Sequence, residues 1–218
     1  GIRDDNTMGV HRNYILQSTL VALSLEGHSF CIVGYNIRHD KNKIINSSHV
    51  VLPGVGAFGN AMKQIEKYNL HSTILEYAKS NKPLLGICLG MQILLTVSYE
   101  FGVHKGLGLI EGKVIKISNE KNKEIKIPHI GWNEIYPNNN KKEWKNKILK
   151  NPLIGKNFYF VHSFICLTKD SDSTIAVCNY SDISIPAVVA TGNVFGCQFH
   201  PEKSSDNGLA VLKNFCEI

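Results

Sequence analysis

The chain has 218 residues, of which 43% are hydrophobic, and its formal net charge is +6 at pH 7. This composition allows one sizeable core. The sequence has no run of 18 or more apolar residues, so no membrane span is predicted. A nucleic-acid partner is not expected, because the lysines of 119–126 and 138–147 are mixed with asparagine and glutamate and lack a recurring aromatic platform. Both stretches are predicted to be solvated loops or hairpin edges.

The six cysteines occur without a compact framework and without a C-x-x-C pair. In a chain of this length, such spacing is typical of reduced thiols in the cytosol. The opening residues, 1–14, are polar and lack the apolar region of a secretory signal. We therefore expect a cytoplasmic protein that does not bind a membrane.

The first half of the chain alternates helical and strand patterns. Apolar residues recur at helical spacing in some segments, and short apolar runs closed by glycine or proline separate them. The predicted helices are 15–26, 57–80 and 90–99, and the predicted buried strands are 28–34, 48–54 and 83–88. This succession predicts a parallel sheet covered by helices.

The second half is dominated by strand patterns with turn signals between them. The predicted strands are 112–118, 123–128, 131–136, 157–167, 173–180, 185–191 and 193–199, followed by a helix at 208–217. The whole chain, 1–218, is therefore predicted to be a single α/β domain. Its expected architecture is a parallel or mixed central sheet flanked by helices, with a β-rich second half.

Cys88 lies in the sequence G-I-C-L-G, between a predicted strand and a predicted helix. G-x-C-x-G is the nucleophile elbow pattern with cysteine in place of serine, where the glycines allow a sharp turn and close packing. The start of a helix favours the thiolate, which is the reactive form. A free cysteine can instead be a small buried hydrophobe, but that role needs neither flanking glycine. The pattern therefore favours a nucleophile.

A cysteine nucleophile needs a base, and the base needs an orienting group. Among nine histidines, His200 stands out because it ends an apolar strand and is followed by Pro201 and Glu202. A proline fixes the local backbone, so Glu202 can turn back onto the imidazole. Alone, His200 would be interpreted as a strand cap; together with the elbow, it is predicted to be the base.

Donors for an oxyanion are predicted in the sequence LPGVGAFG, residues 52–59. A strand ends at Pro53, and the glycines that follow leave backbone N–H groups unshielded. The amides of Val55 or Gly56, together with that of Leu89 after the nucleophile, are the expected pair. A phosphate-binding loop is the alternative, but the spacing is not that of a P-loop and no Lys-Ser/Thr follows.

Six motifs occur in order along the chain: LPGVGAFGNAM, GICLGMQ, GLGLIEGKV, IPHIGWNEI, NFYFVHSF and QFHPEKSS. Through them the chain resembles the class I (triad) glutamine amidotransferases over roughly residues 15–217. Within that family it is most similar to the glutaminase subunits of imidazole glycerol phosphate synthases. The elbow and the His-Pro-Glu segment carry the resemblance to the wider family, and GVGAFG, HIGWN and YFVHS narrow it.

The resemblance implies a catalytic triad of Cys88, His200 and Glu202. Gln92 matches a position that helps hold the bound glutamine, and Glu100 matches one that binds the amino group of the substrate. The implied reaction is hydrolysis of L-glutamine to glutamate and ammonia through a thioester, without a metal or a cofactor.

The resemblance also implies that the backbone of His162 and Ser163 lines the substrate pocket. Trp132, Asn133 and Lys203 match positions that face a partner. That partner is a (β/α)8 barrel synthase (cyclase) subunit, bound as a heterodimer, which receives the ammonia.

Alternatives remain open. The product is expected to be imidazole glycerol phosphate in histidine biosynthesis, but related subunits supply ammonia for the amination of a nucleotide sugar in surface polysaccharide synthesis. A catalytically silent regulatory subunit is a further alternative, and small cysteine hydrolases that share the elbow lack the His-Pro-Glu segment. Residues 1–12 depart from the family, which opens with an apolar strand and a glycine-rich turn.

Overall fold

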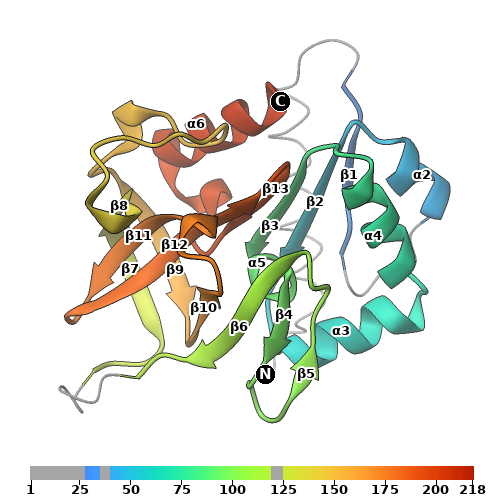
Figure 1. Cartoon of the computed structure of the whole chain (residues 1–218), viewed down its shortest axis with the longest axis horizontal. Helices are drawn as coiled ribbons and strands as arrows, with labels where there is room; N and C mark the ends of the chain where they lie inside the picture. Colours follow the sequence, from blue (N-terminus) through green and yellow to red (C-terminus); the bar gives the residue numbers. More distant parts are fainter. Residues whose placement is uncertain (1–27, 35–39, 119–124) are drawn as a thin grey trace, which may run out of the picture.

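The computed structural model describes residues 28–34, 40–118 and 125–218 (Figure 1). The predicted helix at 15–26 and the atypical residues 1–12 lie outside this part of the chain. Within it, the central feature is a seven-stranded mixed sheet in the order β1-β2-β3-β13-β12-β11-β8. The predicted mixed α/β architecture with a β-rich second half is therefore confirmed.

The first four strands of this sheet run parallel to one another. Each of the other three pairs antiparallel with the strand before it in the sheet order. Their bounds, in sheet order, are β1 Phe30–Ile32, β2 His49–Gly54, β3 Leu84–Cys88, β13 Val194–Cys197, β12 Ile183–Thr191, β11 Thr174–Tyr180 and β8 Tyr136–Pro137. The parallel strands are short apolar runs, as is typical of strands buried on both faces. Strand β13 lies beside β3, so the carboxyl ends of these two strands meet at the same edge of the sheet.

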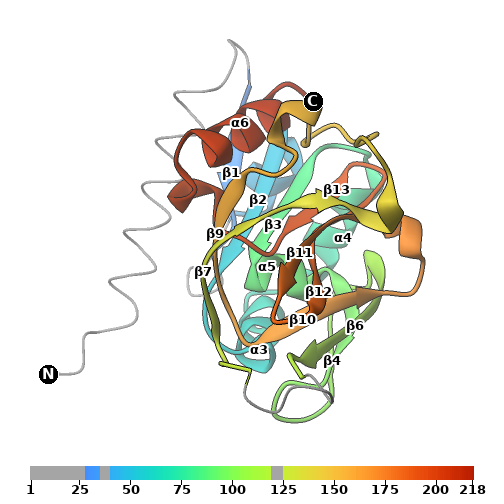
Figure 2. The ribbon, with the colours of Figure 1, turned by 90° about the vertical axis from the view of Figure 1, so that its left-hand side faces the viewer.

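Helices cover both faces of the central sheet (Figures 1 and 2). One face carries α2 (Lys41–Asn46), α3 (Phe58–Lys67), α4 (His71–Lys79) and α5 (Leu89–Ile93), and the other carries α6 (Ser205–Cys216). The side chains of β2 divide between the two cores: Val50 and Leu52 pack on the first side and Val51 on the second. This alternation follows from the two-residue period of a strand.

Two smaller sheets complete the described fold. A four-stranded sheet has the order β10-β6-β4-β5, and an antiparallel pair is formed by β7 and β9. Their bounds are β4 Leu95–Ser98, β5 His104–Lys105, β6 Ile110–Lys116, β7 His129–Glu134, β9 Asn157–His162 and β10 Phe164–Thr168. Short 3-10 turns are η1 Asn138–Asn140, η2 Asn151–Leu153, η3 Ser171–Ser173 and η4 Pro201–Lys203.

The predicted helix at 90–99 is wrong in its second half. Helix α5 ends at Ile93, and Leu95–Ser98 forms strand β4, which pairs with β6 and β5. An apolar run of this length fits both a helix and a strand, and tertiary pairing decided between them. The segment includes Thr96 and Val97, whose branched side chains favour a strand.

Three further predictions need correction. The helical pattern of 57–80 is two helices, α3 and α4, separated by Asn69 with a φ of 53°. The predicted strand 157–167 is divided at Ser163 into β9 and β10, which belong to different sheets. The predicted strand at 123–128 is not a strand in its described part, 125–128, and the Ile127–Pro128 peptide there is cis.

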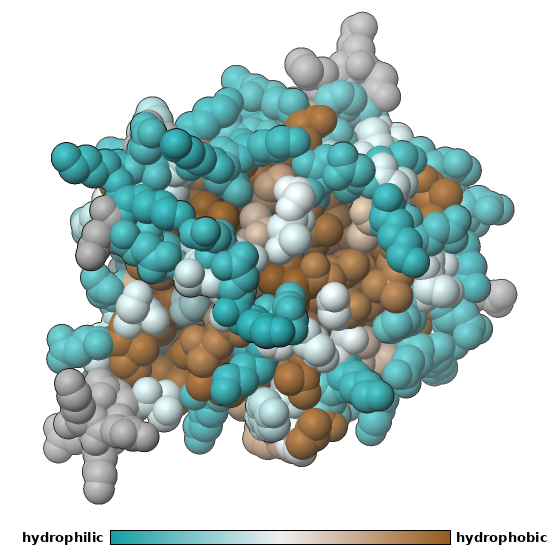
Figure 3. Space-filling view, in the orientation of Figure 1, coloured by the Kyte–Doolittle hydropathy of each residue, from teal (hydrophilic) through white to brown (hydrophobic). Residues whose placement is uncertain are grey.

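The surface of the described residues mixes polar and apolar areas. The face drawn in Figure 3 is hydrophilic around most of its edge and has hydrophobic areas near its middle. In the lysine-rich stretch 138–147, Lys141, Lys142 and Lys145 are exposed, as predicted, while Trp144 is buried. Among the described helices, none combines the length and apolar character needed to cross a bilayer.

Candidate active site

The predicted turn between a strand and a helix is present at Cys88. The residue ends β3, precedes the first residue of α5, and has a φ of 55° and a ψ of −109°. A positive φ is unfavourable for a residue other than glycine, and such strain is concentrated at functional sites. The side chain of Cys88 is 7% exposed.

The flanking glycines of the elbow serve close packing. A Cβ atom on Gly86 would lie 2.5 Å from the carbonyl oxygen of Gly90, so α5 could not fold back onto β3 with any side chain there. Helix α5 has five residues, far fewer than predicted. Its help to a thiolate at Cys88 is therefore limited to the free N–H groups of its first turn, because the helix is too short for a full macrodipole.

His200 and Glu202 form a buried hydrogen-bonded pair. The Nδ1 atom of His200 lies 2.8 Å from Oε1 of Glu202, and the two side chains are 2% and 8% exposed. His200 follows β13, and Glu202 lies in the turn η4 that Pro201 begins. The hydroxyl of Ser204 donates to the carbonyl of His200 at 2.7 Å, so a hydrogen bond joins the two ends of the turn. This geometry holds the imidazole in one orientation.

The second ring nitrogen of His200 is left for Cys88. Nε2 is buried and makes no hydrogen bond of full geometry within the described residues. Burial disfavours the charged imidazole, but interactions with Cys88 and Glu202 outweigh burial and raise the pKa of His200 to about 9. The site therefore favours an imidazolium at His200, next to a sulfur that can carry the negative charge.

The loop after β2 begins beside Cys88. In the register of the parallel strands β2 and β3, Gly54 is the partner of Cys88. The next residues are exposed, Val55 by 48%, and Gly56 has a φ of 106°. Gly59 does not belong to this loop: it lies in α3, where a Cβ atom would approach the ring of His104 to 2.7 Å. A glycine is needed at this position because the His104 ring packs against it. The expectation that Gly59 helps to expose a backbone N–H group is therefore wrong.

The side chain of Glu100, which follows β4, reaches the first residue of α3. Its Oε2 accepts a hydrogen bond of 2.6 Å from the backbone N–H of Phe58, and its own N–H donates to Ser98. The side chain is buried, with 8% exposed. A carboxylate in this position stabilises the N-terminus of α3, and so fixes the end of the loop that contains Gly56. In the described part of the chain, no hydrogen bond joins Glu100 to another predicted site residue.

Gln92 is joined to Cys88 through Gln198. The Nε2 atom of Gln92 donates to the carbonyl of Phe164 at 3.3 Å and to Oε1 of Gln198 at 3.2 Å, and Nε2 of Gln198 lies 3.7 Å from Sγ of Cys88. The carbonyl of Val161 lies 3.8 Å from the same sulfur. The sulfur of Cys88 thus lies between a donor and an acceptor.

His162 continues this network towards Asn133. Its Nδ1 donates to the carbonyl of Phe164 at 2.8 Å, its Nε2 lies 3.0 Å from Nδ1 of His129, and Nε2 of His129 lies 2.7 Å from Oδ1 of Asn133. Burial lowers the pKa of both histidines, that of His162 to about 3. The carbonyl of Ser163 accepts from the N–H of Ile117 and is therefore already paired within the protein.

Trp132 and Lys203 meet on one exposed surface through Tyr159. The rings of Trp132 and Tyr159 are 5.9 Å apart and edge to face, and Nζ of Lys203 lies 5.7 Å from the centre of the Tyr159 ring. Trp132 and its neighbour on the same strand face, Ile130, are 52% and 58% exposed. We call Ile130, Trp132, Tyr159 and Lys203 the aromatic face.

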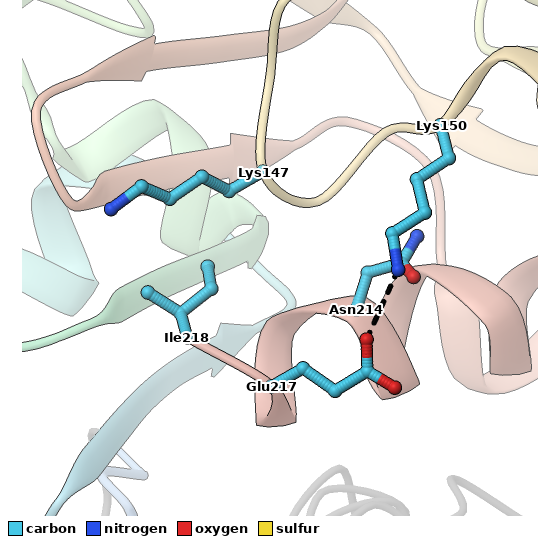
Figure 4. A pocket seen from close by; sticks show the side chains of 5 residues that line it. All are labelled: Lys147, Lys150, Asn214, Glu217 and Ile218. Carbon is cyan, nitrogen blue, oxygen red and sulfur yellow. Dashed lines mark hydrogen bonds and ion pairs between the residues drawn. The ribbon is translucent and has the colours of Figure 1, made fainter.

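A separate pocket lies at the end of α6 (Figure 4). None of the predicted site residues lines it. Lys150 and Glu217 form an ion pair of 3.0 Å at this pocket. Its lining is Lys147, Lys150, Asn214, Glu217 and Ile218, which offers no nucleophile for the chemistry predicted at Cys88.

Sequence reasoning missed Gln198, Val161 and Tyr159. One signal was available: Gln198 and His200 are two residues apart at the end of a predicted strand, and this spacing places side chains on the same face of a strand. Val161 contributes only a backbone carbonyl, and Tyr159 acts through its ring. Neither had a signal in the sequence that pointed to Cys88 or Lys203.

Known proteins are similar to this chain in sequence and in fold. The family "Glutamine amidotransferase class-I" matches residues 12–218. "Imidazole glycerol phosphate synthase subunit HisH 1" of Legionella pneumophila (strain Lens) is 42% identical over 185 residues, which are 84% of this chain and 87% of that protein. The subunit HisH of Methanosarcina barkeri is 43% identical over 204 residues, 93% of each chain.

A solved structure agrees in fold. A crystal structure of a glutamine amidotransferase superimposes with a TM-score of 0.63 at 16% identity, and the match covers 94% of both chains. At that identity the likeness concerns the fold alone. The family match and the relatives above 40% identity decide the membership: this chain belongs to the class-I glutamine amidotransferase family.

Proposed function

We propose that this protein is a glutaminase subunit that hydrolyses L-glutamine to glutamate and ammonia and passes the ammonia to a synthase partner. The product of the pair is imidazole glycerol phosphate, an intermediate of histidine biosynthesis. The observation that carries the reaction is the strained elbow at Cys88 together with the buried His200–Glu202 pair. The names of the relatives support the pathway.

The nucleophile is Cys88 and the base is His200. His200 takes the thiol proton on Nε2, and Glu202 keeps the ring oriented and stabilises its positive charge. The raised pKa of His200 favours this imidazolium. The thiolate attacks the side-chain amide carbon of glutamine, and His200 returns the proton to the departing nitrogen, so that ammonia leaves and a thioester forms.

The oxyanion is held by backbone amides. Val55 or Gly56 and Leu89 supply the N–H groups, because the loop after Gly54 runs beside Cys88 and Leu89 is the first residue of α5. Water then attacks the thioester carbonyl, with His200 as the base. Cys88 leaves as the thiol, and glutamate is released.

The substrate is held by polar groups near the elbow. Gln92 uses its Nε2 within the protein, so its Oε1 is the atom left to accept a hydrogen bond from glutamine. Glu100 uses Oε2 for Phe58, which leaves Oε1 for the substrate ammonium group. The backbone around His162 and Ser163 forms the remaining wall, to which Val161 contributes its carbonyl.

The partner is a (β/α)8 barrel synthase subunit that forms a heterodimer with this chain. Ammonia is largely protonated near neutral pH, and the protonated form is not a nucleophile, so direct transfer to the partner is required. The aromatic face is the proposed contact. Asn133, although expected there, directs its side chain to the other face of β7, where it contacts His129 and the carbonyl of Asn179. Exposed aromatic side chains and a lysine are typical anchors of protein interfaces.

The experiment is a glutamine hydrolysis assay of the chain alone and with a barrel partner. We expect weak hydrolysis alone and a large increase with the partner and its ligand, because the Gly56 loop can present its amides in more than one orientation. Mass spectrometry of a quenched reaction should detect a glutamyl thioester on the peptide that contains Cys88. High turnover that no partner changes, or a thioester elsewhere, would contradict the proposal.

A further inference from the structure

Gln198 is a fully buried amide that contacts the proposed nucleophile. Its side chain is 0% exposed, and its Nε2 lies 3.7 Å from Sγ of Cys88. We infer that Gln198 stabilises the thiolate of Cys88 by donating this N–H hydrogen bond, in a direction fixed by Gln92 and the carbonyl of Phe164. The inference rests on the proposed function of Cys88 as a nucleophile, and it adds a residue outside the triad.

The direction of the amide follows from a chain of hydrogen bonds. The carbonyl of Phe164 can only accept, so Gln92 must present Nε2 to it. The same Nε2 also faces Gln198, which must therefore present Oε1 to Gln92. Only Nε2 of Gln198 is then left for the sulfur. Turning either amide over would place two acceptors or two donors against each other, at a buried position where that is costly.

The consequence for Cys88 is a preference between its two protonation states. A thiol can donate to the carbonyl of Val161, at 3.8 Å, whereas a thiolate has no proton to give. The N–H of Gln198 acts in the opposite direction, because a donor interacts more strongly with a charged sulfur than with a neutral one. Removing this donor should shift the balance towards the thiol.

Two titratable side chains interact with Cys88, those of His200 and Cys166. His200 is the charged partner of the sulfur, and Glu202 lies behind it. Cys166 of β10 is fully buried, and burial raises the pKa of its thiol, so it stays neutral. His200 interacts directly with Cys88, so an experiment on the thiol reports the pair. Gln198 itself does not titrate.

The test is the pH dependence of alkylation. The full chain is treated with iodoacetamide between pH 5 and 10, and the rate of modification at Cys88 is measured by mass spectrometry of its peptide. The variants are Gln198→Met, which keeps the length of the side chain and removes the donor, and Gln198→Leu. The matched control is Gln64→Met, at a half-buried glutamine of α3.

We expect the midpoint of the alkylation profile to move to higher pH in Gln198→Met, with a roughly tenfold lower rate near neutral pH. The rate at high pH, where the sulfur is fully ionised, should be unchanged. Gln64→Met should follow the wild-type profile. In Gln92→Leu, which frees the amide of Gln198 to turn, a smaller shift in the same direction is expected.

A merely structural role would give a different result. Loosened packing would change the rate at high pH and leave the midpoint in place, and that outcome, in whichever of the two Gln198 variants folds, would overturn the inference. The proposed function is tested separately, by glutamine hydrolysis of the wild-type chain with a barrel partner. A shifted midpoint without hydrolysis in the wild type would reject the function and keep the inference.

Discussion

Gly54 and Cys88 are partners in the register of two parallel strands, at the end where both strands leave the sheet. This pairing places the start of the loop at Val55 beside Cys88, and it rests on the backbone register alone. The carboxyl ends of parallel strands are where α/β proteins build their sites. The spacing between Cys88 and the proposed oxyanion donors is therefore set by the sheet.

The conformation of the loop predicts an effect of substitution at Gly56. Its φ of 106° is unfavourable for any residue with a Cβ atom, although no other atom lies within 4 Å of the added carbon. Gly56→Ala should lower kcat at least tenfold, because the backbone must turn to relieve strain of about 1–3 kcal/mol. Steady-state kinetics with the partner present measure this.

Gly192→Ala is the matched control, since Gly192 also has a positive φ, 58°, and open space around it, in the turn between β12 and β13. That variant should lose a little stability and keep its kcat. Equal losses of activity in both variants would show that the effect at Gly56 comes from general destabilisation.

Cys88→Ser should abolish glutamine hydrolysis and leave the fold intact. The loss should amount to several orders of magnitude, as for the removal of other covalent nucleophiles. The serine fits the space of the cysteine, so circular dichroism and binding of a partner should be unchanged. Cys178→Ala, at a fully buried cysteine of β11, is the control and should affect stability alone. Comparable hydrolysis in Cys88→Ser would reject the assignment.

Lys203→Glu should weaken binding of the partner. The ammonium group lies over the ring of Tyr159, which Trp132 also contacts, so a carboxylate there would reverse the charge of the aromatic face and oppose the ring. In a coupled assay, the glutamine-dependent rate of the pair should fall at least tenfold, while the ammonia-dependent rate of the partner stays.

Lys213→Glu makes the same change in charge on an exposed residue of α6 and should leave both rates unaltered. An equal loss of the glutamine-dependent and ammonia-dependent rates in Lys203→Glu would indicate damage that is unrelated to transfer. No change in either rate would place the contact elsewhere.

Buried histidines predict a loss of stability in acid. Burial lowers the pKa of His49 to about 4 and that of His162 to about 3. Below the ordinary pKa near 6.5, the unfolded chain binds protons that the folded chain excludes, so the free energy of unfolding should fall by about 1.4 kcal/mol per pH unit for each histidine down to about pH 4. Urea denaturation at pH 5, 6 and 7 measures this slope.

His200 has the opposite effect at high pH. Its pKa is raised to about 9, so its stabilising contribution is complete below pH 6.5 and is lost as the pH rises to 9. Maximal stability is therefore expected near pH 6.5. His49→Phe, which keeps a ring against Phe30 and Phe215, should flatten the acid slope. An unchanged slope in this variant would exclude His49 as a cause.

The local structure around Cys88, His200 and Glu202 could be predicted from the sequence. Gly86, Cys88 and Gly90 indicate a sharp turn because their effect is steric and acts over a few residues. The pairing of His200 with Glu202 is similarly local, since Pro201 limits the backbone between them. The short apolar strands and the change to a β-rich second half also follow from periods of a few residues.

Contacts between distant residues needed the tertiary structure. Gln92 and Gln198 are 106 positions apart and Cys88 and Gln198 are 110 apart, yet one hydrogen-bonded chain joins them. No local pattern encodes that meeting, because it depends on β13 inserting beside β3. The same holds for Leu95–Ser98, whose apolar run fits a helix until β6 supplies a strand to pair with.

The sequence alone thus indicated the turn at Cys88 and the pairing of His200 with Glu202, since side-chain chemistry and backbone sterics are local properties. The folded chain decided which groups surround them. Gln198 at the sulfur, Val161 opposite it, and Tyr159 between Trp132 and Lys203 all depend on the register of strands far apart in the chain. Strand register depends on how all the strands of a sheet pack together, so it cannot be read from any single segment of the chain.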